Sequence, residues 1–267
     1  MIHSHVDWLP LPLLRRLGVP FLTTMHGRLD LPGLSEVVRT FPDAGLVSIS
    51  DHQRRPLPEA NWLGTILHGM PTNVLRPAFE PGSYLAFLGR LTAEKGPLEA
   101  IRIARAAGKP LRIAAKIPRA ETAYFRKHLQ PHIDGENVQL IGEVDDARKQ
   151  PFLAGAAALL FPIEWPEPFG LVMIEAMACG TPVIAYRSGS VPEVVDEGVT
   201  GFIVDSDEEA VRALSELPRL DRRRVRARFE QRFSALRMAR EYEGLYRELV
   251  AAAGGADREP DLQPSPT

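Results

Sequence analysis

The hydrophobic and polar positions between residues 84 and 217 alternate between two periods. Short apolar runs rich in β-branched and aromatic residues are followed by segments in which apolar residues recur every three or four positions. This succession is typical of strand–helix units on a parallel sheet and predicts a complete Rossmann-like domain. Strands are predicted at 84–88, 111–115, 138–141, 158–161, 182–185 and 202–204. Helices are predicted at 98–107, 120–129, 147–153, 171–178, 191–195 and 208–217.

The first eighty residues repeat this pattern less completely. Strands are predicted at 2–4, 21–25, 46–50 and 65–67, and helices at 9–17 and 34–40. A segment at 71–82 with three prolines and a glycine is the predicted linker to the complete domain. Beyond the complete domain, residues 219–246 have a helical period, whereas 251–267 are small, polar and proline-rich, which predicts disorder. The predicted fold class is therefore α/β, with one partial and one complete Rossmann-like domain.

The amino-acid composition indicates a globular protein but does not indicate its function. The chain has 267 residues, 45% hydrophobic and 25% charged, which is typical of a globular protein with a buried core. Its net charge of −2 offers no global attraction to nucleic acid or to anionic membranes, so an anionic ligand would have to be bound locally. The single cysteine, Cys179, excludes an intrachain disulfide and is predicted to be a packed core thiol.

No segment predicts membrane insertion or export. The longest apolar run of note, 152–163, is shorter than the ~18 residues that a membrane span needs. The N-terminus lacks a basic region followed by an apolar stretch, so it does not resemble a signal peptide. A cytoplasmic protein is the expectation.

Two loops carry residues suited to an anionic ligand. Residues 88–97 follow a predicted strand and precede a helix, the place where open α/β sheets bind ligands. Glycines there allow close backbone approach, Arg90 supplies a planar guanidinium for phosphate, and Lys95 adds a second positive charge. The alternative reading of this loop is a solvated turn.

The second loop, 164–170, leads into a predominantly apolar helix whose N-terminus near Gly170 exposes free N–H groups. Glu167 lies in the loop and Glu175 lies eight positions later in the helix. A carboxylate such as that of Glu175 is costly to bury unpaired, so we expect it to face hydroxyl donors.

The spacing of these two acids resembles the Glu, seven residues, Glu signature of the retaining glycosyltransferases of family 4, the glycogen-synthase-like group 1 enzymes with the GT-B fold. Four motifs carry the resemblance, in order, over residues 84–217: Gly89-Arg90 with Lys95-Gly96, Glu167-Pro168-Phe169-Gly170 with Glu175-Ala176-Met177-Ala178, Gly180-Thr181-Pro182-Val183-Ile184, and Gly198-Val199-Thr200-Gly201-Phe202. Residues 20–204 also look like bacterial members described as UDP-glucose:tetrahydrobiopterin glucosyltransferases.

The resemblance implies a role for each matching residue. Arg90 and Lys95 would bind the donor diphosphate, helped by N–H groups at Gly170 and Leu171. Glu175 would accept hydrogen bonds from the ribose hydroxyls, and Glu167 would lie beside the donor sugar. The base would lie against the loops at 116–118 and 142–144. The implied donor-binding set is Gly89, Arg90, Lys95, Ile117, Val144, Glu167, Phe169, Gly170, Leu171 and Glu175.

His26 is the candidate from the other domain, because it ends a predicted strand at a position where the family has a histidine near the reacting sugar. The implied catalytic set is then His26, Glu167, Arg90 and Lys95, with no metal ligand and no cofactor. The other reading of His26 is structural. His3, His5 and His68 are interpreted as structural residues, although His68 begins the family's hinge loop. Seven arginines at 219–232 are interpreted as a solvated helix face, with contact to anionic lipid head groups as the alternative.

Together these features divide the chain into four parts. Residues 1–81 are the partial acceptor-side domain with its linker, and 82–232 the nucleotide-sugar donor domain. By resemblance, 233–252 form a helix that returns to the first domain, before a disordered tail at 253–267. Compared with the family the chain is expected to be N-terminally shortened. The strand at 2–4 would then be an open sheet edge, which predicts self-association.

The predicted function is metal-independent, retaining transfer of a hexose, glucose from UDP-glucose by resemblance, to a small-molecule or glycan acceptor. In this mechanism the diphosphate leaves, stabilised by Arg90, Lys95 and helix N–H groups. The alternative is a truncated nucleotide-sugar-binding protein without turnover. No GxGxxG follows a strand, which disfavours a dinucleotide oxidoreductase. The sequence also has no Walker A loop, GxSxG elbow or HExxH pair, the motifs of P-loop proteins, α/β-hydrolases and zinc proteases.

Overall fold

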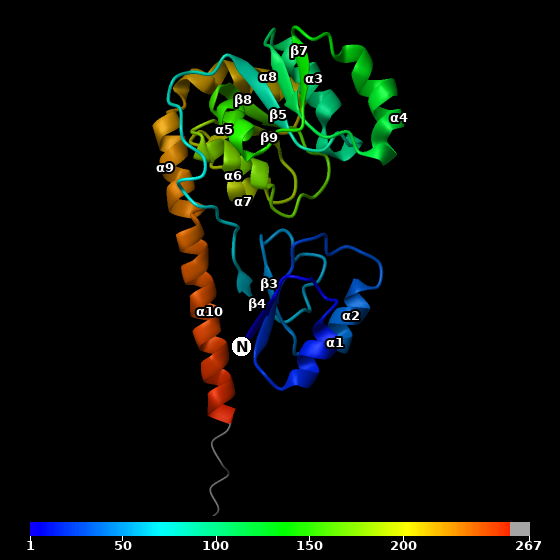
Figure 1. The fold of residues 1–267 in the computed structure, drawn as a ribbon, viewed down its shortest axis with the longest axis vertical. Coiled ribbons are helices and arrows are strands. Elements are labelled where there is room, and N and C mark those ends of the chain that lie inside the picture. The colour runs from blue at the N-terminus through cyan, green and yellow to red at the C-terminus, as the bar shows by residue number, and fades with distance from the viewer. Residues whose placement is uncertain (257–267) are drawn as a thin grey trace, which may run out of the picture.

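The computed structural model of the chain describes residues 1–256, with side chains to residue 253. They form two α/β domains, placed one above the other in Figure 1, and a long C-terminal helix runs down beside the lower domain. Within residues 1–256, no helix is long and apolar enough to cross a membrane. The prediction of disorder from residue 251 is wrong for residues 251–256, which belong to the last helix (Ala235–Ala256), and the rest of the predicted tail lies outside the described residues.

The N-terminal domain is a parallel sheet in the order β1-β2-β3-β4. Ile2 of β1 pairs with Phe21 of β2, and β1 forms one edge of the sheet. Four apolar side chains just after this edge strand are exposed, Val6, Leu9, Leu13 and Leu17. Self-association through this edge stays a prediction. The elements are β1 (Ile2–Ser4), α1 (Leu11–Leu14), β2 (Phe21–Thr24), α2 (Leu34–Thr40), β3 (Gly45–Ser48) and β4 (Trp62–Thr65).

The C-terminal domain is a parallel sheet, as the strand–helix alternation predicts, and its strand order is β10-β9-β8-β5-β6-β7. Its strands are β5 (Tyr84–Leu88), β6 (Leu111–Ala114), β7 (Val138–Gly142), β8 (Ala156–Phe161), β9 (Val183–Tyr186) and β10 (Gly201–Val204). Its helices are α3 (Pro97–Ala106), α4 (Thr122–Tyr124), α5 (Asp146–Ala154), α6 (Leu171–Ala178), α7 (Val191–Val194), α8 (Asp207–Glu216) and α9 (Arg222–Arg232).

The strands of this sheet are apolar on both sides because helices cover both faces. Along β5, Tyr84 and Ala86 join a core that includes α6 and α9, whereas Leu85 and Phe87 join a core that includes α3 and α8. Leu85 and Ala86 are completely buried in these cores. The carboxyl ends of β5 and β8 therefore lie on a well-packed sheet, and the loops that follow them carry the candidate residues.

The N-terminal sheet is covered on one face by α2 and on the other by α10 (Ala235–Ala256). Tyr242 of α10 is buried against Leu22 and Val47, and its hydroxyl lies 2.8 Å from Thr24 Oγ1. Figure 1 shows α10 continuing from α9 down along the lower domain. The last helix thus ties the two ends of the chain together.

The structure differs from the predicted elements in a few places. The helical period over 219–246 is divided between α9 and α10 close to the expected boundary at 232/233, where Phe233 is fully buried and Met70 bonds to the backbone on both sides of Ser234. The last strand of the first sheet is β4 at Trp62–Thr65, earlier than predicted. Residues 119–129 form a 3₁₀ turn, α4 and a π-helical turn rather than one helix.

The solvated-face interpretation of the arginines at 219–232 is wrong for two of them. Arg222 is 7% exposed and donates to Ala78 O, Ala154 O, Ala156 O and Thr181 Oγ1 at 2.7–2.9 Å. Arg226 is 9% exposed and donates to carbonyl oxygens of Thr72, Leu75 and Ala178. These guanidinium groups attach α9 to the interdomain linker and to the ends of neighbouring elements. Neither is available to a lipid surface.

Candidate functional site

The loop after β5 is built by glycine at a close approach. Gly96 has φ +71°, and a Cβ added there would lie 2.0 Å from Pro162 O, so only glycine allows the two loops to touch. Glu164 N donates to Glu94 O at 3.1 Å, which joins the same two loops. Arg90 projects from this loop with a side chain 63% exposed, and Glu94 is 3.9 Å away. Gly89 remains in the sheet, donating to Ala114 O.

Lys95 and Glu167, predicted from separate motifs, meet directly. The Lys95 ammonium forms an ion pair with Glu167 Oε2, and their side chains are only 16% and 13% exposed. Trp165 completes the group: its Nε1 donates to Glu167 Oε2 at 3.0 Å, and Lys95 Nζ lies 4.6 Å from the centre of its ring. A cation against the face of an indole is attracted by the ring quadrupole. No role was predicted for Trp165 from the sequence, although it lies two residues before Glu167.

The N-terminus of α6 lies directly after this group. Gly170 is its N-cap with φ +80°, and an added Cβ would lie 2.7 Å from the Met173 side chain. Leu171 begins the helix and is exposed. The Phe169 side chain is 2% exposed, with its ring edge-on to His68 at 4.9 Å between centroids. Phe169 therefore cannot offer its side chain to a donor; it anchors the loop instead.

From the sequence, Glu175 was expected to face hydroxyl donors. In the structure its carboxylate is paired with a lysine. Its Oε1 accepts from Lys149 Nζ of α5 at 2.9 Å, and both side chains are about one-fifth exposed, 17% and 21%. Burial lowers the pKa of Lys149, but the hydrogen bond and charge of Glu175 outweigh it and raise the pKa overall. Lys149 is a site residue that sequence reasoning missed, because α5 and α6 become neighbours only in the fold.

The loops predicted to hold a base follow β6 and β7. Ile117 and Val144 are half-buried in these loops, each packed against a core cluster of the C-terminal domain. Lys116 and Glu143 bridge the two loops at 3.7 Å, with both side chains more than 65% exposed. The structure thus places both predicted base contacts at the carboxyl edge that also carries Lys95 and Glu167.

His26 belongs to a chain of aromatic rings that crosses between the domains. Its Nε2 lies 2.9 Å from His5 Nδ1, and its backbone N donates to Asp7 Oδ1. Its ring stacks on His68, with an interplanar angle of 5° and centroids 5.3 Å apart. His68 in turn contacts Phe169 of the loop that carries Glu167. His5 and His68, interpreted from sequence as structural, are therefore direct neighbours of the candidate catalytic histidine.

Burial favours the neutral form of His68 and His26. Burial first, and nearby charged groups such as His26 second, lower the pKa of His68 to about 4, and burial together with His5 lowers the pKa of His26 below its usual value. His3 also has its pKa lowered to about 4 by burial, and its ring bridges Tyr246 and Thr24 at 2.7 and 2.8 Å. Neutral His26 can donate or accept one hydrogen bond at a sugar hydroxyl.

A second residue of the N-terminal domain reaches the same group. The Arg28 guanidinium lies 5.5 Å from the ring centre of Trp165, so Trp165 has cations from both domains near its ring. Arg28 is also held by Asp30 through two hydrogen bonds of 2.8 and 2.7 Å. Arg28 lies two residues after His26, and no role was predicted for it from the sequence. Across residues 1–256, no cluster of three or more His, Cys, Asp or Glu side chains could hold a metal ion.

Two Rossmann-like domains joined by a hinge, with candidate residues on the loops of both, define the GT-B class of fold. Residues 76–232 match the family model described as glycosyl transferases group 1. The chain belongs to this family. A crystal structure of AviGT4, a glycosyltransferase involved in avilamycin A biosynthesis, superposes with a TM-score of 0.70 at 27% identity, covering 87% of this chain and 68% of that one.

Curated relatives agree with this assignment. The chain is 28% identical to the D-inositol 3-phosphate glycosyltransferase of Arthrobacter sp. (strain FB24), over 79% of this chain and 59% of that protein. It is 31% identical to the N-acetyl-alpha-D-glucosaminyl L-malate synthase of Bacillus anthracis, over 45% of this chain and 32% of that protein. The sucrose-phosphate synthase of Thermosynechococcus elongatus shares the fold, with a TM-score of 0.77 at 23% identity, covering 94% of this chain and 74% of that one. The matches span 59% or less of these curated relatives' length.

Proposed function

We propose that this chain binds a nucleoside diphosphate sugar and transfers its sugar, with retention, to an acceptor. The observation that carries the proposal is the meeting of Lys95, Glu167 and Trp165 directly before the N-terminus of α6, beside the exposed guanidinium of Arg90. Free N–H groups at a helix N-terminus and two nearby cations form a site for a diphosphate. Glu167 supplies an acceptor for sugar hydroxyls next to it.

The donor is proposed to be UDP-glucose, on the strength of the motif resemblance. Its uracil would lie against the loops of Ile117 and Val144, and its ribose hydroxyls would bind Glu175. Lys149 holds Oε1 of that carboxylate at 2.9 Å, which would fix its orientation before the ribose arrives. Preorganised acceptors lower the entropic cost of binding.

In the proposed reaction, the bond between the anomeric carbon and the β-phosphate oxygen breaks while a bond to the acceptor oxygen forms on the same face. The acceptor proton passes to the departing phosphate oxygen. Arg90, Lys95 and the α6 N–H groups would stabilise the charge that develops on the diphosphate, so no divalent ion is required. His26, neutral at pH 7, would hydrogen-bond a sugar hydroxyl rather than carry a charge.

The acceptor side is proposed to be the N-terminal domain, where His26 connects to Phe169 through His68 and the Arg28 guanidinium lies 5.5 Å from the ring centre of Trp165. Tetrahydrobiopterin, suggested by the closer resemblance, is the first acceptor to test, followed by small polyols and glycans. The alternative function, nucleotide-sugar binding without turnover, predicts the same donor contacts and differs only in the product formed.

The test is a transfer assay with UDP-glucose and each acceptor, in buffer containing EDTA, with products analysed by mass spectrometry and anomeric NMR. An α-linked product from the α-linked donor supports retaining transfer, and an inverted product contradicts it. Binding of UDP-glucose without product or hydrolysis favours the binding protein. Activity that appears only after a divalent ion is added contradicts the metal-independent reaction.

A further inference from the structure

One turn of the N-terminal domain contacts both halves of the candidate site. Residues 50–53 follow β3, and within this turn Ser50 is completely buried and Gln53 is 4% exposed. A buried polar side chain is stable only if its hydrogen bonds are satisfied. The partners of these two side chains therefore show what the turn is built to hold.

Gln53 holds the segment that carries His26. Its Nε2 donates to Met25 O and to Gly27 O, both at 2.9 Å, and its Oε1 accepts from Ile49 N at 2.8 Å. The two carbonyls belong to the residues immediately before and after His26. One amide group thus fixes the backbone on either side of the histidine.

Ser50 holds the loop that carries Glu167. Its hydroxyl donates to Pro168 O at 2.6 Å and accepts from Gln53 N at 3.0 Å. Within the C-terminal domain the same loop is held by Ser188 and Ser190. Their hydroxyls donate to Trp165 O and Phe169 O, and Ser190 N donates to Glu167 O. Ser50 is the contribution of the other domain to this set of hydroxyls.

Glu193 of α7 binds the turn from the C-terminal side. Its two carboxylate oxygens accept from Asp51 N and His52 N, each at 2.7 Å. Hydrogen bonds to an ionised acceptor are roughly twice as strong as neutral ones. The backbone of Glu193 is itself held by Arg232, whose Nη2 donates to Glu193 O at 2.6 Å. The turn is therefore clamped from both directions.

We infer that Ser50, Gln53 and Glu193 are positioning residues that set His26 against Glu167, and so set the acceptor against the donor sugar. The inference rests on the proposed function for its catalytic consequence. That these residues fix the position of one domain relative to the other follows from the hydrogen bonds alone. A displacement of about 1 Å between reacting groups can cost on the order of 100-fold in rate.

The kinetic test uses Ser50→Ala, Glu193→Ala and Glu193→Gln, with Ser215→Ala and Glu243→Ala as controls. Ser215 and Glu243 are exposed and hydrogen-bond only locally among the described residues, to Arg212 O and Arg247. We expect kcat to fall at least 10-fold in both alanine variants at nearly unchanged Kd for UDP. Gln at position 193 keeps one acceptor oxygen and should recover part of the loss. Equal loss of UDP affinity, or unchanged kcat, overturns the assignment.

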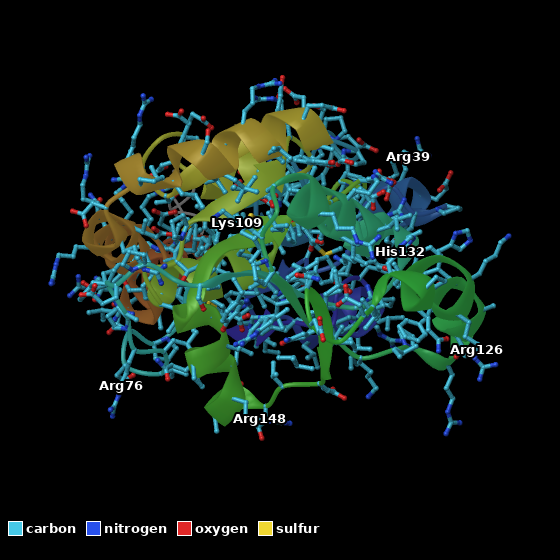
Figure 2. All side chains as sticks on the ribbon, turned by 90° about the horizontal axis from the view of Figure 1, so that it is seen from above. Arg39, Arg76, Lys109, Arg126, His132 and Arg148 are labelled. Atoms are coloured by element: carbon cyan, nitrogen blue, oxygen red, sulfur yellow. The ribbon has the colours of Figure 1, made fainter. Side chains whose placement is uncertain are left out.

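The second measurement needs no turnover. Cys179 is fully buried, so spin labels can be attached selectively at Arg39→Cys on α2 and Arg212→Cys on α8. Both arginines are exposed, and Figure 2 shows Arg39 at the periphery of the molecule. The parent should give a narrow distance distribution, and Glu193→Ala a distribution at least twice as broad. An unchanged distribution contradicts the positioning role. If the parent binds UDP without transfer, the proposed function fails and this distribution alone decides the inference.

Discussion

Arg222→Met tests whether the buried guanidinium of Arg222 holds the interdomain linker against the C-terminal domain. Arg222 is 7% exposed and makes four hydrogen bonds, to three carbonyls and one hydroxyl. Burial lowers the pKa of its guanidinium, but the group stays charged at neutral pH. Methionine replaces the aliphatic part of the side chain but would leave all four acceptors without the guanidinium donors.

The magnitude follows from the acceptors. Each unsatisfied buried acceptor costs about 1 kcal/mol or more, so the four together predict a loss of about 3–5 kcal/mol in the free energy of unfolding. That is a large share of a typical total of about 5–15 kcal/mol. Arg222→Lys should lose roughly half as much, because one ammonium cannot reach all four acceptors in the planar geometry of the guanidinium.

The assay is urea unfolding followed by tryptophan fluorescence and circular dichroism. Arg224→Met, an exposed arginine on the same helix, is the matched control and should change the stability by no more than about 0.5 kcal/mol. The slope of the transition must agree between variants for the comparison to hold. If Arg222→Met and Arg224→Met unfold at the same urea concentration, the burial argument is refuted and α9 is a solvated face after all.

Three further predictions address the site and its support. His3 and His68 have pKa values near 4 against an ordinary 6.5, so the unfolded chain binds more protons between these values; stability should be full above pH 6.5 and fall by on the order of 2 kcal/mol toward pH 4. The double variant His3→Gln/His68→Gln should lose most of this pH dependence. A wild-type melting temperature that does not change over that range, or an equal change in the double variant, contradicts the prediction. Gly96→Ala should destabilise the fold by about 3 kcal/mol or prevent folding, because the φ of Gly96 is +71° and an added Cβ would overlap Pro162 O. Gly108→Ala is the control: Gly108 is exposed and also has a positive φ, but it has open space around it, so the variant should cost about 1 kcal/mol. Equal melting temperatures of the two variants would show that the loops separate freely. Glu175→Ala should weaken UDP about 10-fold in calorimetry but leave 2′,3′-dideoxy-UDP unaffected, and an equal loss for both ligands removes the ribose assignment.

Local patterns were enough to predict the C-terminal domain. The apolar runs of β5 and β8 are buried on both faces, and such strands can be recognised without knowledge of their partners. The glycine-bounded loops after them were also visible, because Gly96 and Gly170 mark positive φ angles. The motifs located Lys95 and Glu167 one by one, although their direct ion pair emerged only in the fold.

Contacts between distant residues were not visible in the sequence. Arg222 and Arg226 look like surface charges on a helix, and their acceptors Ala78 and Thr72 are 144 and 154 positions away. The packing of Phe233 against Phe169 at the break between α9 and α10 was not visible either, although the resemblance placed the start of the last helix at 233. Gln53 gave no signal at all, since a single amide in a turn has no periodicity or motif.

The central claim is that Arg90, Lys95 and the start of α6 bind a diphosphate, and calorimetry with UDP in EDTA tests it most directly. Lys109→Ala is the control, since this exposed lysine, labelled in Figure 2, lies just before β6, at the amino end of that strand. Arg90→Gln changes an exposed side chain and leaves Glu167 paired, so it can be read without a folding defect. We expect UDP to bind the parent and Lys109→Ala with equal affinity. It should bind Lys95→Ala and Arg90→Gln at least 10-fold more weakly. Equal binding by all four proteins would contradict it.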